Sequence, residues 1–195
     1  MANWDEHAEE WDRNEAVQAY AEGAFESLTS LAATTGFALT GATVCDFGCG
    51  TGLLTMRLAD ICARVDAVDT SAGMLEVLGT KIDRCGWKHV RSFRQLPSTP
   101  QGYDLIVCSS VLSFVDDYPG VVSNLISHLG LGGLFVQWDW ELDPDDAEPH
   151  GFTRAQIRRT LEAAGLVDVN VGIEFEVTFD GHTMTPLMGS GRRSN

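Results

Sequence analysis

Residues 43–54, TVCDFGCGTGLL, constrain the fold more than any other part of this chain. A short apolar run leads into three glycines at alternate positions, and a helix-like pattern follows them directly. A buried strand that passes through a glycine-rich turn into a helix is typical of a parallel α/β sheet that holds a ligand at the turn. An acid, Asp46, stands just before the glycines, where such turns usually receive phosphate.

Helix-like and strand-like segments alternate along the chain, which favours an α/β fold with a mainly parallel sheet. Ser71 and Thr153 are expected to cap helices, and Gly36 is expected to end one. Asp180-Gly181 is a strong hairpin signal, so we expect an antiparallel hairpin at the C-terminal edge of the sheet. The expected strands cover residues 42–47, 64–69, 89–93, 103–110 and 132–139, and the expected helices cover residues 15–36, 53–62, 71–86, 118–130 and 153–165.

Three kinds of ligand can be considered for the glycine turn. A dinucleotide fingerprint needs its third glycine at the position of Leu53, and a Walker A loop needs a Gly-Lys-Ser/Thr ending that is absent here. Asp46 would also repel a pyrophosphate by roughly 4 kcal/mol at a separation of about 4 Å and an effective dielectric near 20. A cationic ligand without phosphate fits better, and S-adenosylmethionine has an α-ammonium, a sulfonium and no phosphate.

The composition argues against several partners. The formal net charge of −15 over 195 residues opposes the phosphate backbone, so we expect no nucleic-acid partner. The length fits one compact domain. No segment resembles a signal peptide or matches a membrane span, and the five cysteines lack zinc-ligand spacing. We therefore expect a cytoplasmic protein with no membrane partner and no metal, of an oligomeric state that the sequence leaves open.

The chain resembles the class I S-adenosylmethionine-dependent methyltransferases over roughly residues 4–189, through Asp46, the glycine turn and Asp69. More narrowly, it looks like the small-molecule type that includes the ubiquinone/menaquinone C-methyltransferases. The resemblance implies a Rossmann-like, doubly wound, seven-stranded sheet with an N-terminal helical lid, and S-adenosyl-L-methionine as the cofactor. It also implies that Asp46 lies near the cofactor's ammonium and that Asp69 binds both ribose hydroxyls. The cofactor-binding residues expected from it are Asp46, Gly48, Cys49, Gly50, Asp69, Thr70, Ser71, Met74, Gln95 and Ser109.

Two positions depart from the family pattern. The acid that usually follows the third strand and grips the adenine is missing, so Arg94 or Gln95 is expected to take its place. Phe114 follows the fourth strand where many relatives carry a histidine, which suggests an apolar acceptor wall.

Methyl transfer from a sulfonium is an in-line displacement, and holding the acceptor collinear with the methyl in a dry pocket supplies much of the acceleration. A general base is needed only when the acceptor carries a proton of high pKa. The candidate bases are Asp139 and Glu141 after the fifth strand, with Asp116 and Asp117 after the fourth, although each also fits an ordinary loop or helix-cap acid.

The N-terminal segment is the candidate lid. We expect residues 1–35 to form a lid and helix and residues 41–190 to form the core of a single methyltransferase domain. Trp4 and Trp11 are seven residues apart, so one helical face can present both, either to the pocket or to the core. The acceptor-pocket candidates are Trp4, Trp11, Tyr20 and Phe114. Trp138 and Trp140 are expected on opposite faces of the fifth strand, with only one facing the pocket.

Acidic residues concentrate at positions 5–26 and 139–150. If both stretches meet at the pocket mouth, the negative potential favours a cationic or neutral small-molecule acceptor over an anionic one. Two other functions are considered. The first is binding of S-adenosylmethionine without methyl transfer. The second is that of a nicotinamide-dependent oxidoreductase, which Leu53 argues against because it replaces the third glycine of the dinucleotide fingerprint.

Overall fold

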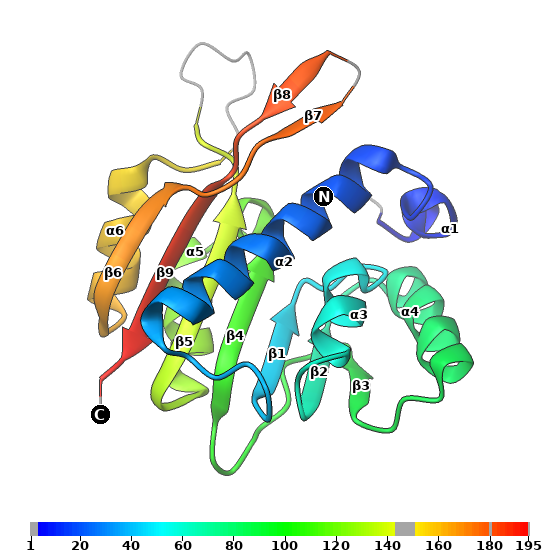
Figure 1. The fold of residues 1–195 in the computed structure, drawn as a ribbon, viewed down its shortest axis with the longest axis horizontal. Helices are drawn as coiled ribbons and strands as arrows, with labels where there is room; N and C mark the ends of the chain where they lie inside the picture. The colour runs from blue at the N-terminus through cyan, green and yellow to red at the C-terminus, as the bar shows by residue number, and fades with distance from the viewer. Residues whose placement is uncertain (1–3, 143–150, 180, 195) are drawn as a thin grey trace.

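The computed structural model describes residues 4–142, 151–179 and 181–194, and its main feature is a seven-stranded sheet in the order β3-β2-β1-β4-β5-β9-β6 (Figure 1). Each neighbouring pair from β3 to β5 is parallel, whereas β9 runs antiparallel to both of its neighbours. The strand order reverses between β1 and β4, and ligands bind at the carboxyl edge of such a switch point. The strands are β1 (Thr43–Phe47), β2 (Arg64–Val68), β3 (Val90–Phe93), β4 (Tyr103–Ser109), β5 (Leu129–Asp139), β6 (Leu166–Ile173) and β9 (Leu187–Arg193).

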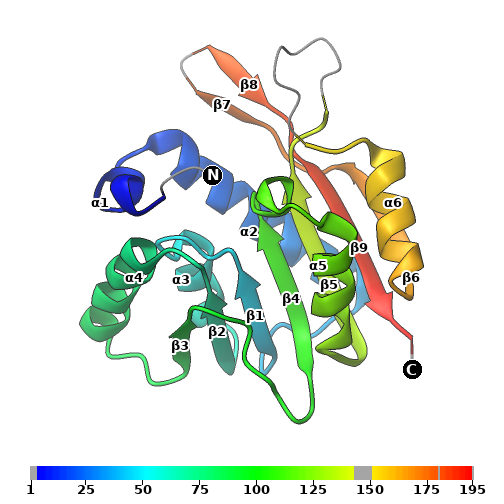
Figure 2. The ribbon, with the colours of Figure 1, turned by 180° about the vertical axis from the view of Figure 1, so that it is seen from behind.

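Helices cover both faces of the sheet (Figures 1 and 2). One face carries α2 (Glu15–Thr35), α3 (Leu53–Ala59) and α4 (Ala72–Cys85), and the other carries α5 (Tyr118–Ser127) and α6 (Arg154–Ala163). Alternate residues of a central strand therefore enter different cores: Val44 packs with α2 and α3, and Cys45 packs with α5 and α6. Burial on both sides explains why these strands read as continuous apolar runs. The fold class expected from the sequence is confirmed.

The expected helix ends are confirmed by their local geometry. The side chain of Ser71 accepts the N–H of Met74 at 3.1 Å and begins α4. Thr153 and Gln156 form a capping box at the start of α6. Gly36 follows α2 with φ = 67°, a left-handed conformation that glycine adopts without strain.

The C-terminal segment adds antiparallel structure in two places. Strands β7 (Val177–Phe179) and β8 (His182–Met184) pair as a separate hairpin that projects beyond the carboxyl edge of the sheet (Figure 1). The chain then returns through β9, which inserts between β5 and β6. The hairpin signal predicts the turn but not this insertion, because insertion depends on long-range pairing.

The N-terminal segment lies over the carboxyl edge of the sheet. It forms a 3₁₀ turn, η1 (Trp4–His7), and one short helix, α1 (Ala8–Trp11), and both contact α4. A second 3₁₀ turn, η2 (Leu112–Phe114), follows β4 at the same edge. Across the described ranges, no helix is both long enough and apolar enough for a bilayer crossing.

One expectation about the fifth strand is wrong. Trp138 and Trp140 both pack against the core on the α2 face, because residues two positions apart in a strand share a face. Trp138 is fully buried and donates its indole N–H to Ser27 at 2.9 Å, whereas Trp140 is only partly buried.

Candidate cofactor and acceptor site

The glycine turn between β1 and α3 depends on its glycines. Gly48, Gly50 and Gly52 all have positive φ, at 74°, 53° and 86°. A β-carbon on Gly48 would lie 2.3 Å from the side chain of Val111, so only glycine fits there. A β-carbon on Gly50 would meet only ordinary contacts, the sulfur of Met74 at 3.9 Å and the indole nitrogen of Trp11 at 4.0 Å.

Asp46, the penultimate residue of β1, precedes this turn and is almost completely buried. One carboxylate oxygen accepts the hydroxyl of Thr55 at 2.6 Å, and the other has no hydrogen-bond partner in the described part of the chain. Burial raises the pKa of Asp46 from 3.8 to about 7. The unpaired oxygen beside a glycine cradle is a site that fits a positively charged group.

Asp69, just after β2, joins the glycine turn to α4. Its carboxylate oxygens accept the N–H of Gly50 at 2.9 Å and the N–H of Ser71 at 2.8 Å. A carboxylate has about four acceptor positions, so two remain for ligand hydroxyls. The sulfur of Met74 is 3.9 Å from the β-carbon position of Gly50, so a residue predicted from the segment after β2 lies next to the glycine turn.

The other expected cofactor contacts are less well defined. Arg94 donates to the backbone oxygen of Thr70 at 2.7 Å, so it supports the loop after β2. Gln95 is exposed in the turn after β3, and Ser109 is half-buried at the end of β4. Cys49 is buried in the glycine turn, and its backbone N–H, like that of Gly48, donates to Val68.

Two acids of the N-terminal segment fasten it to the two cofactor motifs. The carboxylate of Asp5 accepts hydrogen bonds from the hydroxyl of Ser71 and from the N–H of Gly73 at the start of α4. These hydrogen bonds lower the pKa of Asp5, and the bond from Ser71 has the largest effect. Asp12 accepts the hydroxyl of Thr51 in the glycine turn at 2.5 Å and pairs with Lys81 of α4 at 2.5 Å.

The rings of the lid segment meet the loop after β4. Trp4 lies edge-on to Trp11, with centroids 5.7 Å apart, and edge-on to Phe114 at 5.3 Å. The indole nitrogen of Trp11 is 4.0 Å from the β-carbon position of Gly50. Three of the four expected acceptor-pocket residues therefore lie together, and one of them, Trp11, reaches the glycine turn.

The fourth, Tyr20, is buried, as is the candidate base Asp139, and these two residues are called the Tyr20 and Asp139 group. Asp139 is fully buried at the end of β5, and one of its carboxylate oxygens accepts the N–H of Ser113 at 3.1 Å. Burial raises the pKa of Asp139 to about 7. Burial and the nearby Asp139 carboxylate also raise the pKa of Tyr20. Ser110, beside this group, has φ = 53°, a conformation that is uncommon for a non-glycine residue and concentrates at functional sites.

Glu141 lies apart from this group. It is exposed and pairs with Arg154 at 3.0 Å, so its carboxylate has a surface role in this structure. The histidine of the lid, His7, is also exposed. The second acidic stretch falls largely on residues 143–150, outside the described residues, so its position relative to the lid is not described. No group of three or more potential metal ligands occurs in the described ranges.

Sequence reasoning missed Asp5, Asp12 and Lys81. A signal was present, because each lid tryptophan is followed directly by an aspartate, in Trp4-Asp5 and Trp11-Asp12.

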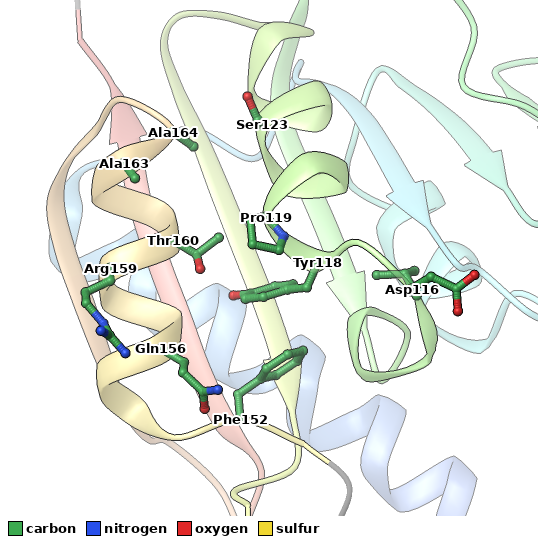
Figure 3. Close-up of a pocket in the computed structure, with 11 residues that line it drawn as sticks. Asp116, Tyr118, Pro119, Ser123, Phe152, Gln156, Arg159, Thr160, Ala163 and Ala164 are labelled. Atoms are coloured by element: carbon green, nitrogen blue, oxygen red, sulfur yellow. The ribbon is translucent and has the colours of Figure 1, made fainter.

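A groove of about 580 Å³ lies elsewhere, between α5 and α6 (Figure 3). Tyr118 and Phe152 stack in it with centroids 4.1 Å apart. It shares no residue with the glycine turn or with the Tyr20 and Asp139 group.

Comparisons with known proteins agree with this geometry. Residues 45–135 match the family model described as a methyltransferase domain. The trans-aconitate 2-methyltransferase of Azoarcus sp. (strain BH72) is 34% identical over 97 residues, which cover 49% of this chain and 38% of that protein. The chain thus spans little more than a third of that relative.

Solved structures resemble the whole sheet. The magnesium protoporphyrin IX methyltransferase of Synechocystis PCC 6803, solved with S-adenosylhomocysteine bound, superposes with a TM-score of 0.71 at 18% identity, covering 92% of this chain and 86% of that one. The [4+2]-cyclase SpnF gives a TM-score of 0.67 at 14% identity, covering 80% and 75%. Residues 45–135 are thus similar to a methyltransferase domain, and the fold resembles that of methyltransferases solved with S-adenosylmethionine or S-adenosylhomocysteine bound.

Proposed function

We propose that this chain binds S-adenosylmethionine and transfers its methyl group to a small-molecule acceptor. The observation that carries the proposal is the pair of acids, Asp46 and Asp69, on either side of the glycine turn. Neither acid forms a salt bridge with a basic side chain among the described residues. Such a site repels phosphate and fits a ligand with an ammonium, a sulfonium and ribose hydroxyls.

Each cofactor contact follows from this arrangement. The unpaired oxygen of Asp46 would accept the ammonium, which would hold the carboxylate ionised despite its burial. The free acceptor positions of Asp69 would take the ribose hydroxyls, and Met74 would line the ribose and adenine. The cofactor would supply an activated methyl group on a sulfonium.

The N-terminal segment would act as a lid, as its contacts support. Asp5 and Asp12 fasten it to both cofactor motifs, and Trp4 and Trp11 lie over the glycine turn. A closed lid excludes water and holds the acceptor against the methyl group. Residues 1–195 would then work as a single domain, with the lid in residues 1–35.

The acceptor is proposed to be cationic or neutral. Lid acids surround Trp4 and Trp11, and the rings of Trp4 and Phe114 offer an apolar or cation-accepting wall. The name of the Azoarcus relative specifies trans-aconitate. A polyanion of that kind is disfavoured here by the acids.

A second function remains from another class, because the fold also occurs in a [4+2]-cyclase. This chain would then bind S-adenosylmethionine without transferring methyl.

An acceptor screen with detection of S-adenosylhomocysteine separates the two. Methyl transfer predicts product with at least one amine or hydroxyl acceptor, at a rate that falls as salt screens the lid acids. Tight binding of S-adenosylmethionine with no product across amines, hydroxyls, thiols and carboxylic acids would favour the binding protein instead.

A further inference from the structure

The groove between α5 and α6 shares no residue with the glycine turn, with Asp69 or with the N-terminal segment (Figure 3). Its volume of about 580 Å³ falls in the range of roughly 300–1,000 Å³ that is usual for small-molecule sites. Eleven residues line it, whereas a stable protein interface uses about 20–30 residues on each side. The size of the groove therefore fits a small molecule better than a protein partner.

Aromatic side chains form the floor of this groove. The rings of Tyr118 and Phe152 stack with centroids 4.1 Å apart, and each residue is only 8% exposed. The hydroxyl of Tyr118 donates to Gln137 of β5 at 2.9 Å, which holds that ring in place. Pro119 and Ala163 add apolar surface from α5 and α6 (Figure 3). The ring or the alkyl chain of a ligand can pack against such a lining.

The α6 side of the groove carries a cation that no acid neutralises among the described residues. Arg154 and Arg158, on the same helix, each form a salt bridge with a glutamate, at 3.0 Å and 3.8 Å. Arg159 lines the groove, and only its Nε is used, in a hydrogen bond to the backbone oxygen of Ala155 at 3.2 Å. Its two terminal nitrogens have no partner in the described ranges.

Gln156 lies one turn before Arg159 on α6 and also lines the groove. Residues three apart on a helix are neighbours on its surface. The Oε1 atom of Gln156 accepts the N–H of Thr153 at 2.8 Å in the capping box, and its Nε2 has no partner among the described residues. Asp116, the acid of the groove, lies at the other end, away from Arg159 (Figure 3). Two neighbouring groups with free N–H donors therefore lie beside an aromatic floor, which suits a carboxylate ligand.

We propose that the groove between α5 and α6 binds a small monocarboxylate with an aromatic or apolar body. The terminal nitrogens of Arg159 and the amide of Gln156 would bind the carboxylate, and the body would pack against Phe152 and Tyr118. The net charge of −15 disfavours ligands with more than one negative charge. The inference goes beyond the proposed function and does not depend on it.

A matched pair of probes separates charge from shape. The acid 3-phenylpropionate and its neutral amide, 3-phenylpropanamide, have the same body, and each is titrated into the isotope-labelled chain while backbone amide signals are followed by NMR. The wild type should bind the acid about fivefold more tightly than the amide, because hydrogen bonds between charged groups are stronger than neutral ones. The shifted signals should belong to α5 and α6. Arg159→Gln should remove the preference, so that the two dissociation constants agree within about twofold.

Arg158→Gln is the matched control. Arg158 is the preceding residue of α6, does not line the groove and pairs with Glu162, so this variant should keep the preference for the acid. Ala163→Trp is the blocking variant. Because Ala163 is exposed and lines the groove, the indole should fill the groove without disturbing the core and should weaken binding of both probes about tenfold.

The same titrations can overturn the inference. They do so if the wild type binds neither probe or binds both equally, if the preference survives in Arg159→Gln, or if the shifted signals belong to the glycine turn. S-adenosylhomocysteine should not displace the acid, and displacement would assign the acid to the proposed cofactor and acceptor site. A wild type that dimerises in sedimentation experiments, with an Ala163→Trp variant that does not, would assign the groove to a second copy of the chain.

Discussion

Three fully buried aspartates lie in strands of this sheet, and they differ in whether a basic side chain pairs with them. Asp66 in β2 is neutralised by Arg64 and Arg91 and also accepts the hydroxyl of Tyr103 at 3.0 Å. Asp46 and Asp139 have no basic partner in the described ranges, and each keeps one unpaired oxygen. Burying a carboxylate without a cation destabilises the folded state, so these two positions are functional candidates on energetic grounds alone.

This difference predicts how stability depends on pH. The pKa values of Asp46 and Asp139 are raised from 3.8 to about 7 in the folded protein, so the folded state binds protons that the unfolded state releases above pH 4. Their contribution is present below pH 4 and is lost as pH rises to 7, up to about 4 kcal/mol for each group. Without cofactor, Asp139→Asn should therefore gain stability over the wild type as pH rises from 5 to 8.

Urea denaturation at pH 5, 6, 7 and 8 measures the difference between the two proteins. Because other acids titrate in both, only the difference is interpreted. A difference that stays constant across this range would show that Asp139 does not carry a raised pKa.

At the scale of elements, Lys81 of α4 forms a clasp with Asp12 of the N-terminal segment, which we propose to be a lid, and with Thr51 of the glycine turn. Lys81 is the centre of it: its ammonium pairs with Asp12 of the lid and donates to the backbone oxygen of Thr51 at 2.8 Å. The side chain of Lys81 is only 12% exposed, so this pair is screened less than a surface pair. The N-terminal segment and the glycine turn are therefore linked through Lys81, in addition to the direct hydrogen bond between Thr51 and Asp12.

Breaking the clasp should loosen the lid. Lys81→Met keeps the apolar stem and removes the charge, and we expect it to weaken S-adenosylmethionine binding about 3- to 10-fold and to make tryptophan fluorescence easier to quench with acrylamide. Arg13→Met is the control, because Arg13 pairs with Glu10 in the same segment but both side chains are more than 75% exposed. Identical quenching and affinity in the two variants would rule out the clasp.

Elements and local caps could be predicted because they depend on local chemistry. The alternating pattern, the caps at Ser71 and Thr153 and the glycine turn all follow from residues close together in the chain. The insertion of β9 and the Asp5–Ser71 contact could not, because each joins distant segments whose pairing no local pattern encodes. Only the structure shows which acids pair with a cation and which keep an unpaired carboxylate oxygen.

For the whole molecule, the fold collects at one edge everything that the proposed function needs. The glycine turn, Asp69 and the N-terminal segment proposed as a lid all lie where β1, β2 and β4 end, and the β7–β8 hairpin projects beyond the same edge (Figure 1). The net charge of −15 adds a field that attracts a cationic cofactor and repels phosphate. Binding should therefore select for charge as well as for shape.

Calorimetric titration of the chain with S-adenosylmethionine, S-adenosylhomocysteine and NAD⁺ tests the proposed cofactor. We expect binding of the first two and none of the third. We also expect Asp69→Ala to weaken S-adenosylmethionine binding by about 1.5–3 kcal/mol, the range for hydrogen bonds to a charged group, while Asp60→Ala at the exposed end of α3 leaves it unchanged. No heat with S-adenosylmethionine, binding of NAD⁺ in its place, or equal affinity in Asp69→Ala would contradict it.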